Sequence, residues 1–165
     1  FYGWSKKVSN IIVQKFKCVM LHPSKLPHFA GGSPIQNQII RNVNKSAVTL
    51  FLMNEKIDHG NILIQKELSL LGELDEIFNR IIKIGTLLTL KILKKNYKEK
   101  KTKIHKIYKR RNPQQSEITL KEIKHKSATY LYNKIRMLQD PYPNAFIRTS
   151  DGKKLYIQKT SVSKK

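Results

Sequence analysis

A short apolar run that ends in a histidine constrains the fold of this chain more than any other feature. Cys18–Leu21 is continuously apolar and His22 follows it, a pattern typical of a strand buried on both faces. Residues 5–16 precede it with apolar side chains three, four and eight positions apart, which indicates a helix. The opening Phe1–Trp4 resembles the end of an earlier strand. Strand, helix and strand in this order predict an α/β fold with a mostly parallel sheet.

The middle of the chain continues the alternation of strands and helices. Ser33 and Pro34 are typical of the N-cap and first residue of a helix. Residues 46–53 and 61–68 are β-rich and flank a polar loop, so we expect a hairpin or two neighbouring strands. Residues 73–95 repeat apolar side chains with helical spacing.

The last third differs in composition, and we expect three parts. Residues 1–95 form the α/β part, residues 96–112 a basic linker, and residues 113–165 a small α+β subdomain. In this subdomain we expect a strand over residues 116–123, a helix after Ser127, and a hairpin turning at Ser150-Asp151-Gly152.

His22 and Asp58 are the candidate catalytic pair. Ligands bind at the carboxyl ends of strands in open α/β sheets, which is where His22 lies. Asp58 belongs to the polar loop between the two β-rich segments, so a shared sheet brings it near the imidazole. A carboxylate beside an imidazole fixes its tautomer and makes an acid–base pair. A structural histidine in a turn and a turn-forming aspartate remain the alternatives.

The positive charge is large and uneven. The net charge is +22, and residues 94–165 carry 21 Lys/Arg against 5 Asp/Glu. Two interpretations are open: an anionic partner such as RNA or a nucleotide, or a Lys-rich composition spread over solvated faces. No paired Cys/His spacing indicates a metal site, and no apolar run is long enough to span a membrane. The single cysteine, Cys18, suggests a buried thiol in a cytoplasmic protein.

Seven segments stand out in the chain: Leu21–Pro27, Gly31–Gln36, Ala47–Thr49, Ile57–Ile62, Tyr108–Pro113, Ser116–Ile118 and Ile135–Phe146. In order and spacing they resemble the methionyl-tRNA formyltransferase family, which includes the amino-sugar N-formyltransferases and glycinamide ribonucleotide formyltransferase. The first βα units of the family's Rossmann-like domain have no counterpart. We therefore expect this chain to be the C-terminal part of a formyltransferase.

The resemblance implies transfer of a formyl group from 10-formyltetrahydrofolate to a primary amine, without a metal. His22 matches the family's catalytic histidine and Asp58 the aspartate that orients it. The residues that the resemblance places at the folate are Tyr2, Gly3, Trp4, Asn54 and Ile57. Those that it places at the acceptor are His28, Gly31, Gly32, Ser33 and Gln36. Phe1 and Trp4 are equally compatible with a place in the core, and Arg110-Arg111 with a solvated pair.

Two positions depart from the family pattern. Met20 stands where the family has an asparagine that polarises the formyl oxygen, and a thioether cannot donate a hydrogen bond. Loss of one such donor costs ~10²–10³ in rate unless a backbone N–H or a hydroxyl such as that of Ser24 replaces it. Ala30 stands where many relatives carry arginine, which bears on how an acceptor phosphate is held.

The acceptor has two candidates, a nucleotide-linked amino sugar and methionyl-tRNA. The basic C-terminal region favours the tRNA. Residues 110–165 are few for a five-stranded barrel, which favours the sugar. A homodimer is left open. The alternative from another class is a catalytically impaired, basic RNA-binding or assembly fragment with the same fold.

Overall fold

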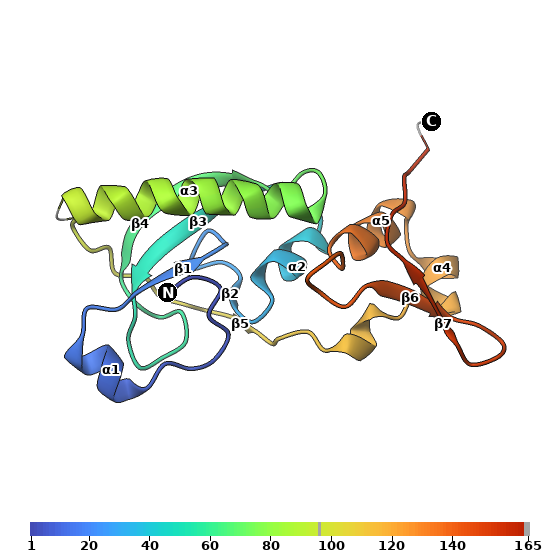
Figure 1. Cartoon of the computed structure of the whole chain (residues 1–165), viewed down its shortest axis with the longest axis horizontal. Helices are drawn as coiled ribbons and strands as arrows, with labels where there is room; N and C mark the ends of the chain where they lie inside the picture. The colour runs from blue at the N-terminus through green and yellow to red at the C-terminus, as the bar shows by residue number, and fades with distance from the viewer. Residues whose placement is uncertain (96, 164–165) are drawn as a thin grey trace.

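The structure is a computed structural model that describes residues 1–95 and 97–163. Residue 96 of the expected linker and residues 164–165 of the expected subdomain lie outside it. A three-stranded sheet carries the long helix α3 on one side, and the C-terminal elements gather beyond α2 (Figure 1). The first elements are α1 (Asn10–Lys15), β1 (Val19–His22), β2 (Ala30–Gly31), α2 (Pro34–Ile39), β3 (Lys45–Leu52), β4 (Ile62–Ser69) and α3 (Leu74–Lys94).

The expectation of a mostly parallel sheet is wrong for the strands that the structure describes in the main sheet. Its order is β1-β3-β4, and both pairs are antiparallel. His22 at the end of β1 is in register with Thr49 in β3. The connection between β1 and β3 explains this direction. Its helix α2 has only six residues, so the chain is still at the end of the sheet where β1 finishes when β3 begins. A parallel crossover must instead return the chain along the whole strand.

The core lies between the sheet and α3. The expected helix over residues 73–95 is confirmed, and a capping box between Glu73 and Glu76 begins it. Its buried face packs on β4 and β3. The buried side chains at this contact are Leu21, Val48, Leu50, Leu74, Ile77, Ile81 and Leu88. Gly85 permits a close approach, because a Cβ there would lie 2.5 Å from Leu21 Cδ1.

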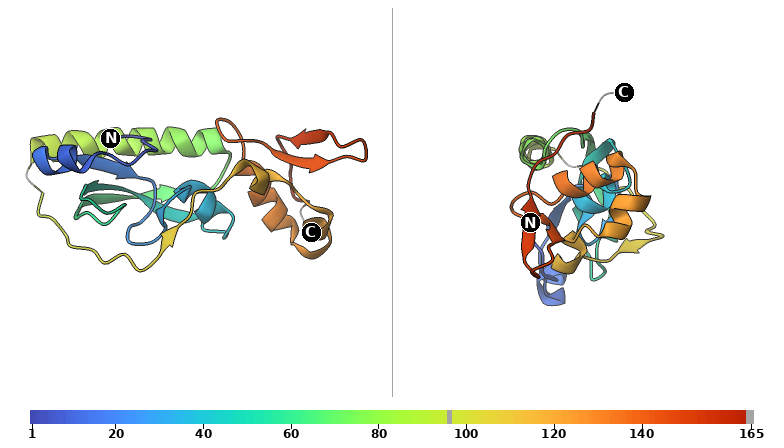
Figure 2. Two further views of the ribbon diagram at one scale, coloured as in Figure 1. Left: turned by 90° about the horizontal axis from the view of Figure 1, so that it is seen from below. Right: turned by 90° about the vertical axis from the view of Figure 1, so that its right-hand side faces the viewer.

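The segment after α3 runs back along the sheet toward the C-terminal elements (Figures 1 and 2). Ile62 and Lys100 exchange backbone hydrogen bonds of 2.9 and 2.8 Å. Further on, β5 pairs in parallel with β2. The remaining elements are β5 (Ile107–Tyr108), η1 (Pro113–Ser116), α4 (Leu120–His125), α5 (Ala128–Arg136), β6 (Ala145–Arg148) and β7 (Lys154–Ile157).

The strand expected over residues 116–123 is wrong, because its second half is α4. The Thr119 hydroxyl accepts a hydrogen bond from the Glu122 N–H, and the Glu122 side chain bonds back to the Thr119 N–H. This reciprocal cap stabilises a helix start. The helix capped by Ser127 and the β6–β7 hairpin are confirmed.

The C-terminal elements share one apolar core with the main sheet. Ile118, Ile135, Met137 and Leu138 belong to the same buried cluster as Leu74. The division of the chain at residues 96–112 stays a prediction.

Candidate active site

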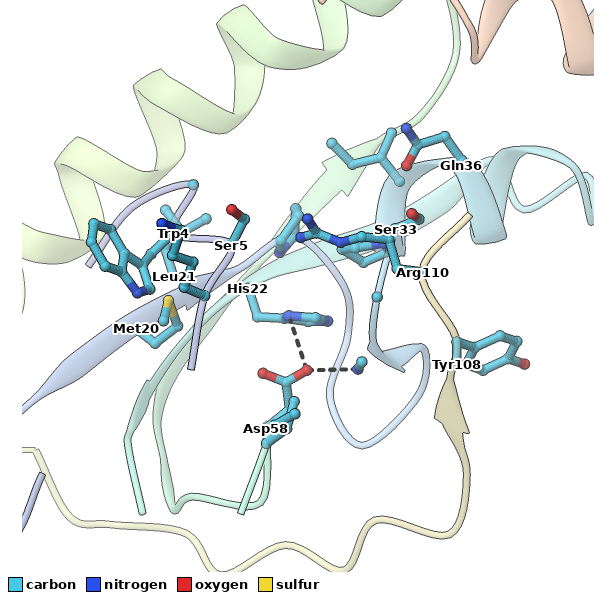
Figure 3. A pocket seen from close by; sticks show the side chains of 18 of the residues that line it. Trp4, Ser5, Met20, Leu21, His22, Ser33, Gln36, Asp58, Tyr108 and Arg110 are labelled. Atoms are coloured by element: carbon cyan, nitrogen blue, oxygen red, sulfur yellow. Dashed lines mark hydrogen bonds and ion pairs between the residues drawn. The ribbon is translucent and has the colours of Figure 1, made fainter. Parts of the chain in front are cut away.

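The strand end and the polar loop meet where the sequence indicates. His22 closes β1, and Asp58 lies between β3 and β4 with a left-handed φ of 57°. The His22 Nδ1 atom lies 3.5 Å from the Asp58 Oδ2 atom, and the two side chains are 7% and 11% exposed. Figure 3 shows the carboxylate beneath the imidazole ring. This distance exceeds that of a tight charge-assisted hydrogen bond.

Backbone groups fix both members of the pair. The Gly31 N–H donates to Asp58 Oδ2 at 2.6 Å. The His22 Nε2 atom lies 3.0 Å from the Phe29 carbonyl oxygen, which accepts a hydrogen bond in the tautomer with the proton on Nε2. The imidazole plane is therefore set from both sides, by Asp58 at Nδ1 and by Phe29 at Nε2.

Glycine permits the loops to approach this closely. Gly31 has a φ of +100°, and a Cβ there would lie 2.4 Å from the Tyr108 carbonyl oxygen. Gly60 follows the Asp58 loop, and a Cβ there would lie 1.4 Å from the Leu52 carbonyl oxygen. Any larger residue at either position displaces backbone beside the pair.

A cavity of about 980 Å³ opens above the pair, large enough for a cofactor-sized ligand. Apart from His28, it brings together all the residues expected at the site. With His22 and Asp58 it is lined by Tyr2, Gly3, Trp4, Gly31, Gly32, Ser33, Gln36, Asn54 and Ile57. His28 is exposed and does not line the cavity. Trp4 is 53% exposed and Phe1 is 41% exposed, so neither is a core residue.

Met20 lines the cavity on the same side of β1 as His22, two residues along the strand (Figure 3). Ser24 does not replace the missing donor. Its hydroxyl is buried, donates to the His28 carbonyl at 2.7 Å and lies outside the cavity. Ser5 lines the cavity near His22 (Figure 3).

Sequence reasoning did not place Arg110 and Tyr142 at the site, yet both line the cavity. The Arg110 side chain extends into it from the segment after β5 (Figure 3). Burial raises the pKa of Tyr142, although Gln36 and Arg110 act in the opposite direction. The phenol therefore remains a neutral donor. Gln36 Oε1 is buried without a hydrogen-bond partner in the described part of the chain, so a ligand donor would satisfy it.

Among the residues described, no group of three or more His, Cys, Asp or Glu side chains could hold a metal ion. Within the same residues, no helix is long and apolar enough to cross a membrane.

A strand-end histidine beside a loop aspartate inside a cavity is the arrangement that acid–base chemistry needs. Comparison with known proteins makes the class specific. Residues 2–85, about half of the chain, match the family described as formyl transferase. The chain therefore belongs to the formyl transferase family.

Individual relatives agree with this assignment. A methionyl-tRNA formyltransferase from Ehrlichia canis is 29% identical over 97% of this chain and 52% of its own length. A solved methionyl-tRNA formyltransferase from Clostridium thermocellum is 31% identical, with a TM-score of 0.82 over 94% of this chain and 75% of its own. A sugar N-formyltransferase from a Shewanella species is 25% identical, with a TM-score of 0.74 over 94% of this chain and 66% of its own. The chain spans about half the length of the curated relatives.

Proposed function

We propose that the protein containing this chain transfers a formyl group from 10-formyltetrahydrofolate to a primary amine. The observation that carries the proposal is the His22–Asp58 contact of 3.5 Å at the floor of a cavity within the formyl transferase region. The family resemblance supplies the donor. The exposed Trp4 ring and the Asn54–Ile57 loop offer the folate an aromatic face and polar groups at one end of the cavity.

In the proposed reaction the amine attacks the formyl carbon, and a new C–N bond forms as the carbonyl oxygen becomes an oxyanion. The amine then loses a proton, and the bond from the formyl carbon to the folate N10 breaks as N10 takes one up. Once a reacting atom replaces the Phe29 carbonyl as the partner of Nε2, the neutral ring with its proton on Nδ1, facing Asp58, takes the amine proton at Nε2 and passes it to N10. Asp58 orients the ring and stabilises its positive charge while the proton is held.

The acceptor enters from the side of α2 in this proposal. Ser33 and Gln36 at the start of α2, with Arg110 and Tyr142, line that part of the cavity. These groups suit a polar or anionic acceptor, either a nucleotide-linked amino sugar or methionyl-tRNA. The sugar and tRNA enzymes among the relatives support both.

The test incubates the full-length protein with 10-formyltetrahydrofolate and, separately, methionyl-tRNA or a panel of amino-sugar nucleotides. Mass spectrometry follows the formylated amine. We expect one acceptor class to gain a formyl group in the wild type and not in His22→Ala. A wild type that formylates no amine, or a His22→Ala variant that retains full activity, contradicts the proposal.

A second candidate is a catalytically impaired RNA-binding module. Met20 in the oxyanion position favours it, as does the charge of the C-terminal region. Such a protein binds RNA with a steep fall of log K against log salt, because many phosphate contacts release counterions. It also gives no formyl transfer. Absence of RNA binding at moderate salt excludes this candidate.

A further inference from the structure

A second, smaller cavity adjoins the first at the Arg110-Arg111 segment and does not include His22. It measures about 460 Å³. The residues that line it are Asn37, Ile40, Arg41, Tyr108, Lys109, Arg110, Arg111, Gln115 and Tyr130. Tyr108, Arg110 and Arg111 also line the first cavity, so the two cavities share a wall. The Tyr108 ring points away from His22 (Figure 3).

The lining of this second cavity is cationic. Arg41, Lys109, Arg110 and Arg111 contribute four positive charges, and no lining residue is acidic. Within the described residues, none of the four forms an ion pair with a carboxylate. The nearby Glu122 is already paired with Lys134 at 2.7 Å.

Arginine is concentrated here against the trend of the composition. The chain has 27 Lys and 6 Arg, and three of those six arginines line this one cavity. A Lys-rich compositional drift does not produce such a cluster. Planar guanidinium groups bind phosphate oxygens with two parallel hydrogen bonds, which lysine cannot do.

The arginines are held in place, with donors left over. Arg41 Nη1 donates to the Asn37 carbonyl at 2.8 Å, and its guanidinium carbon lies 5.0 Å from the Tyr108 ring centroid. Tyr108 is itself stacked on Phe29, with ring centroids 5.1 Å apart. Nη1 also donates to Asn37 Oδ1 at 3.1 Å, so both hydrogen bonds to Asn37 come from Nη1 and leave Nη2 for a ligand.

A buried nitrogen atom of Arg111 that lacks an acceptor is independent evidence for a ligand in this cavity. Its Nη2 atom donates to the Gln115 carbonyl at 2.7 Å, but its buried Nε atom has no acceptor in the described part of the chain. Burial lowers the pKa of Arg111; Tyr130 and Glu122 raise it, and the positive charge of Arg41 lowers it further. An anion between Arg41 and Arg111 would accept from Nε and relieve their repulsion.

We propose that the second cavity binds a phosphate group of the acceptor, while the amine of the same molecule reaches His22 through the first cavity. The inference rests on the proposed function, because it assigns the acceptor a nucleotide phosphate. The phosphate belongs either to a nucleoside diphosphate or to an RNA backbone.

The test measures binding of two probes, UDP and an RNA hairpin of acceptor-stem length, to the full-length protein. Arg41→Gln is the main variant, because Arg41 is exposed and does not line the first cavity. Arg148→Gln removes the same charge at an exposed site outside both cavities and is the matched control. Lys109→Gln is the second test of the cavity and serves if Arg41→Gln fails to fold.

We expect Arg41→Gln to weaken binding about tenfold, the usual cost of one charge-assisted hydrogen bond, while Arg148→Gln changes it less than about twofold. An effect on UDP identifies a free nucleotide as the source of the phosphate. An effect on the hairpin, with a salt dependence shallower by ~0.7–0.9, identifies RNA. No binding of either probe, or equal effects of Arg41→Gln and Arg148→Gln, overturns the inference.

Measuring how UDP and the RNA hairpin bind to His22→Ala separates this inference from the proposed function. His22 does not line the second cavity, so binding should persist when formyl transfer is lost. If the wild type transfers formyl groups but Arg41→Gln and Lys109→Gln bind both probes as the wild type does, only the phosphate site is refuted. If the wild type binds the phosphate probes but formylates no amine, only the proposed function is refuted.

Discussion

The Asp58 Oδ2 atom lies 3.5 Å from His22 Nδ1 and accepts the Gly31 N–H at 2.6 Å. One carboxylate oxygen thus connects the end of β1, the loop before β4 and β2. The same carboxylate oxygen therefore holds both the His22–Asp58 pair and the wall of the cavity.

The first prediction concerns the charge of Asp58. Asp58→Asn keeps the side-chain size and tolerates the left-handed backbone, which asparagine adopts readily. It removes the negative charge that stabilises a protonated His22. We expect formyl transfer to fall about 10²-fold or more, with folate binding little changed. The measurement is kcat and KM against Asp151→Asn, a control in the distant β6–β7 turn. Equal kcat values for the two variants would show that Asp58 only shapes its loop.

The second prediction concerns Met20. Met20→Asn places an amide donor on the cavity side of β1, two residues from His22. We expect the rate to rise by up to ~10²–10³, the usual effect of one oxyanion donor. Met20→Leu, which also lacks a donor, should leave the rate unchanged. A rate for Met20→Asn no higher than that of the wild type indicates that another group already polarises the formyl oxygen.

Local patterns in the sequence predicted much of this site. The apolar run before His22 and the β-rich segments around Asp58 indicated that both residues end on one sheet. Strand direction was not predictable from these patterns, because a strand buried on both faces reads alike in parallel and antiparallel sheets. The direction of β3 depends on the end of the sheet at which α2 hands the chain over to β3. That position is set by how α2 packs and not by the local sequence pattern.

The third prediction concerns Arg136, which is 4% exposed and joins α5 to the turn before α3. Its Nη1 atom donates to the Leu70 and Gly72 carbonyls at 2.8 and 2.9 Å. Arg136→Met leaves both carbonyls without this donor, and we expect the free energy of unfolding to fall by ~2–4 kcal/mol. Urea unfolding measures it. The exposed Arg148→Met should cost less than ~1 kcal/mol, and a similar loss in both variants would contradict this role.

The fourth prediction is a pH dependence carried by Glu122. Burial raises the pKa of Glu122, but hydrogen bonds from Lys134, Thr119 and Tyr130 outweigh it and leave the pKa below its ordinary value of 4.5. Because the pKa of Glu122 is lower in the folded state, its carboxylate stabilises the fold above pH 4.5. This stabilisation is lost as the pH falls through the folded-state pKa. Unfolding free energies measured across this window should decline less steeply for Glu122→Gln than for the wild type. Parallel curves would rule out this contribution.

The second cavity was beyond prediction from the sequence for a physical reason. Arg41 and Arg111 are seventy positions apart in the chain, and the β2–β5 pairing brings their segments together. Two residues per strand leave no recognisable periodicity. The segment of α4 is ambiguous in the sequence because it is so short that its apolar residues fit the period of a strand as well as that of a helix. The cap between Thr119 and Glu122 favours the helix.

Single-turnover formyl transfer separates a role of His22 in the reaction from a role in folate binding. Wild type and His22→Ala of the full-length protein are saturated with 10-formyltetrahydrofolate and mixed with the acceptor found by mass spectrometry, and folate affinity is measured in parallel. We expect His22→Ala to bind folate as the wild type does, within about twofold, and to transfer the formyl group ~10²–10⁴ times more slowly. A His22→Ala variant that transfers the group at the wild-type rate would contradict a role of His22 in the reaction.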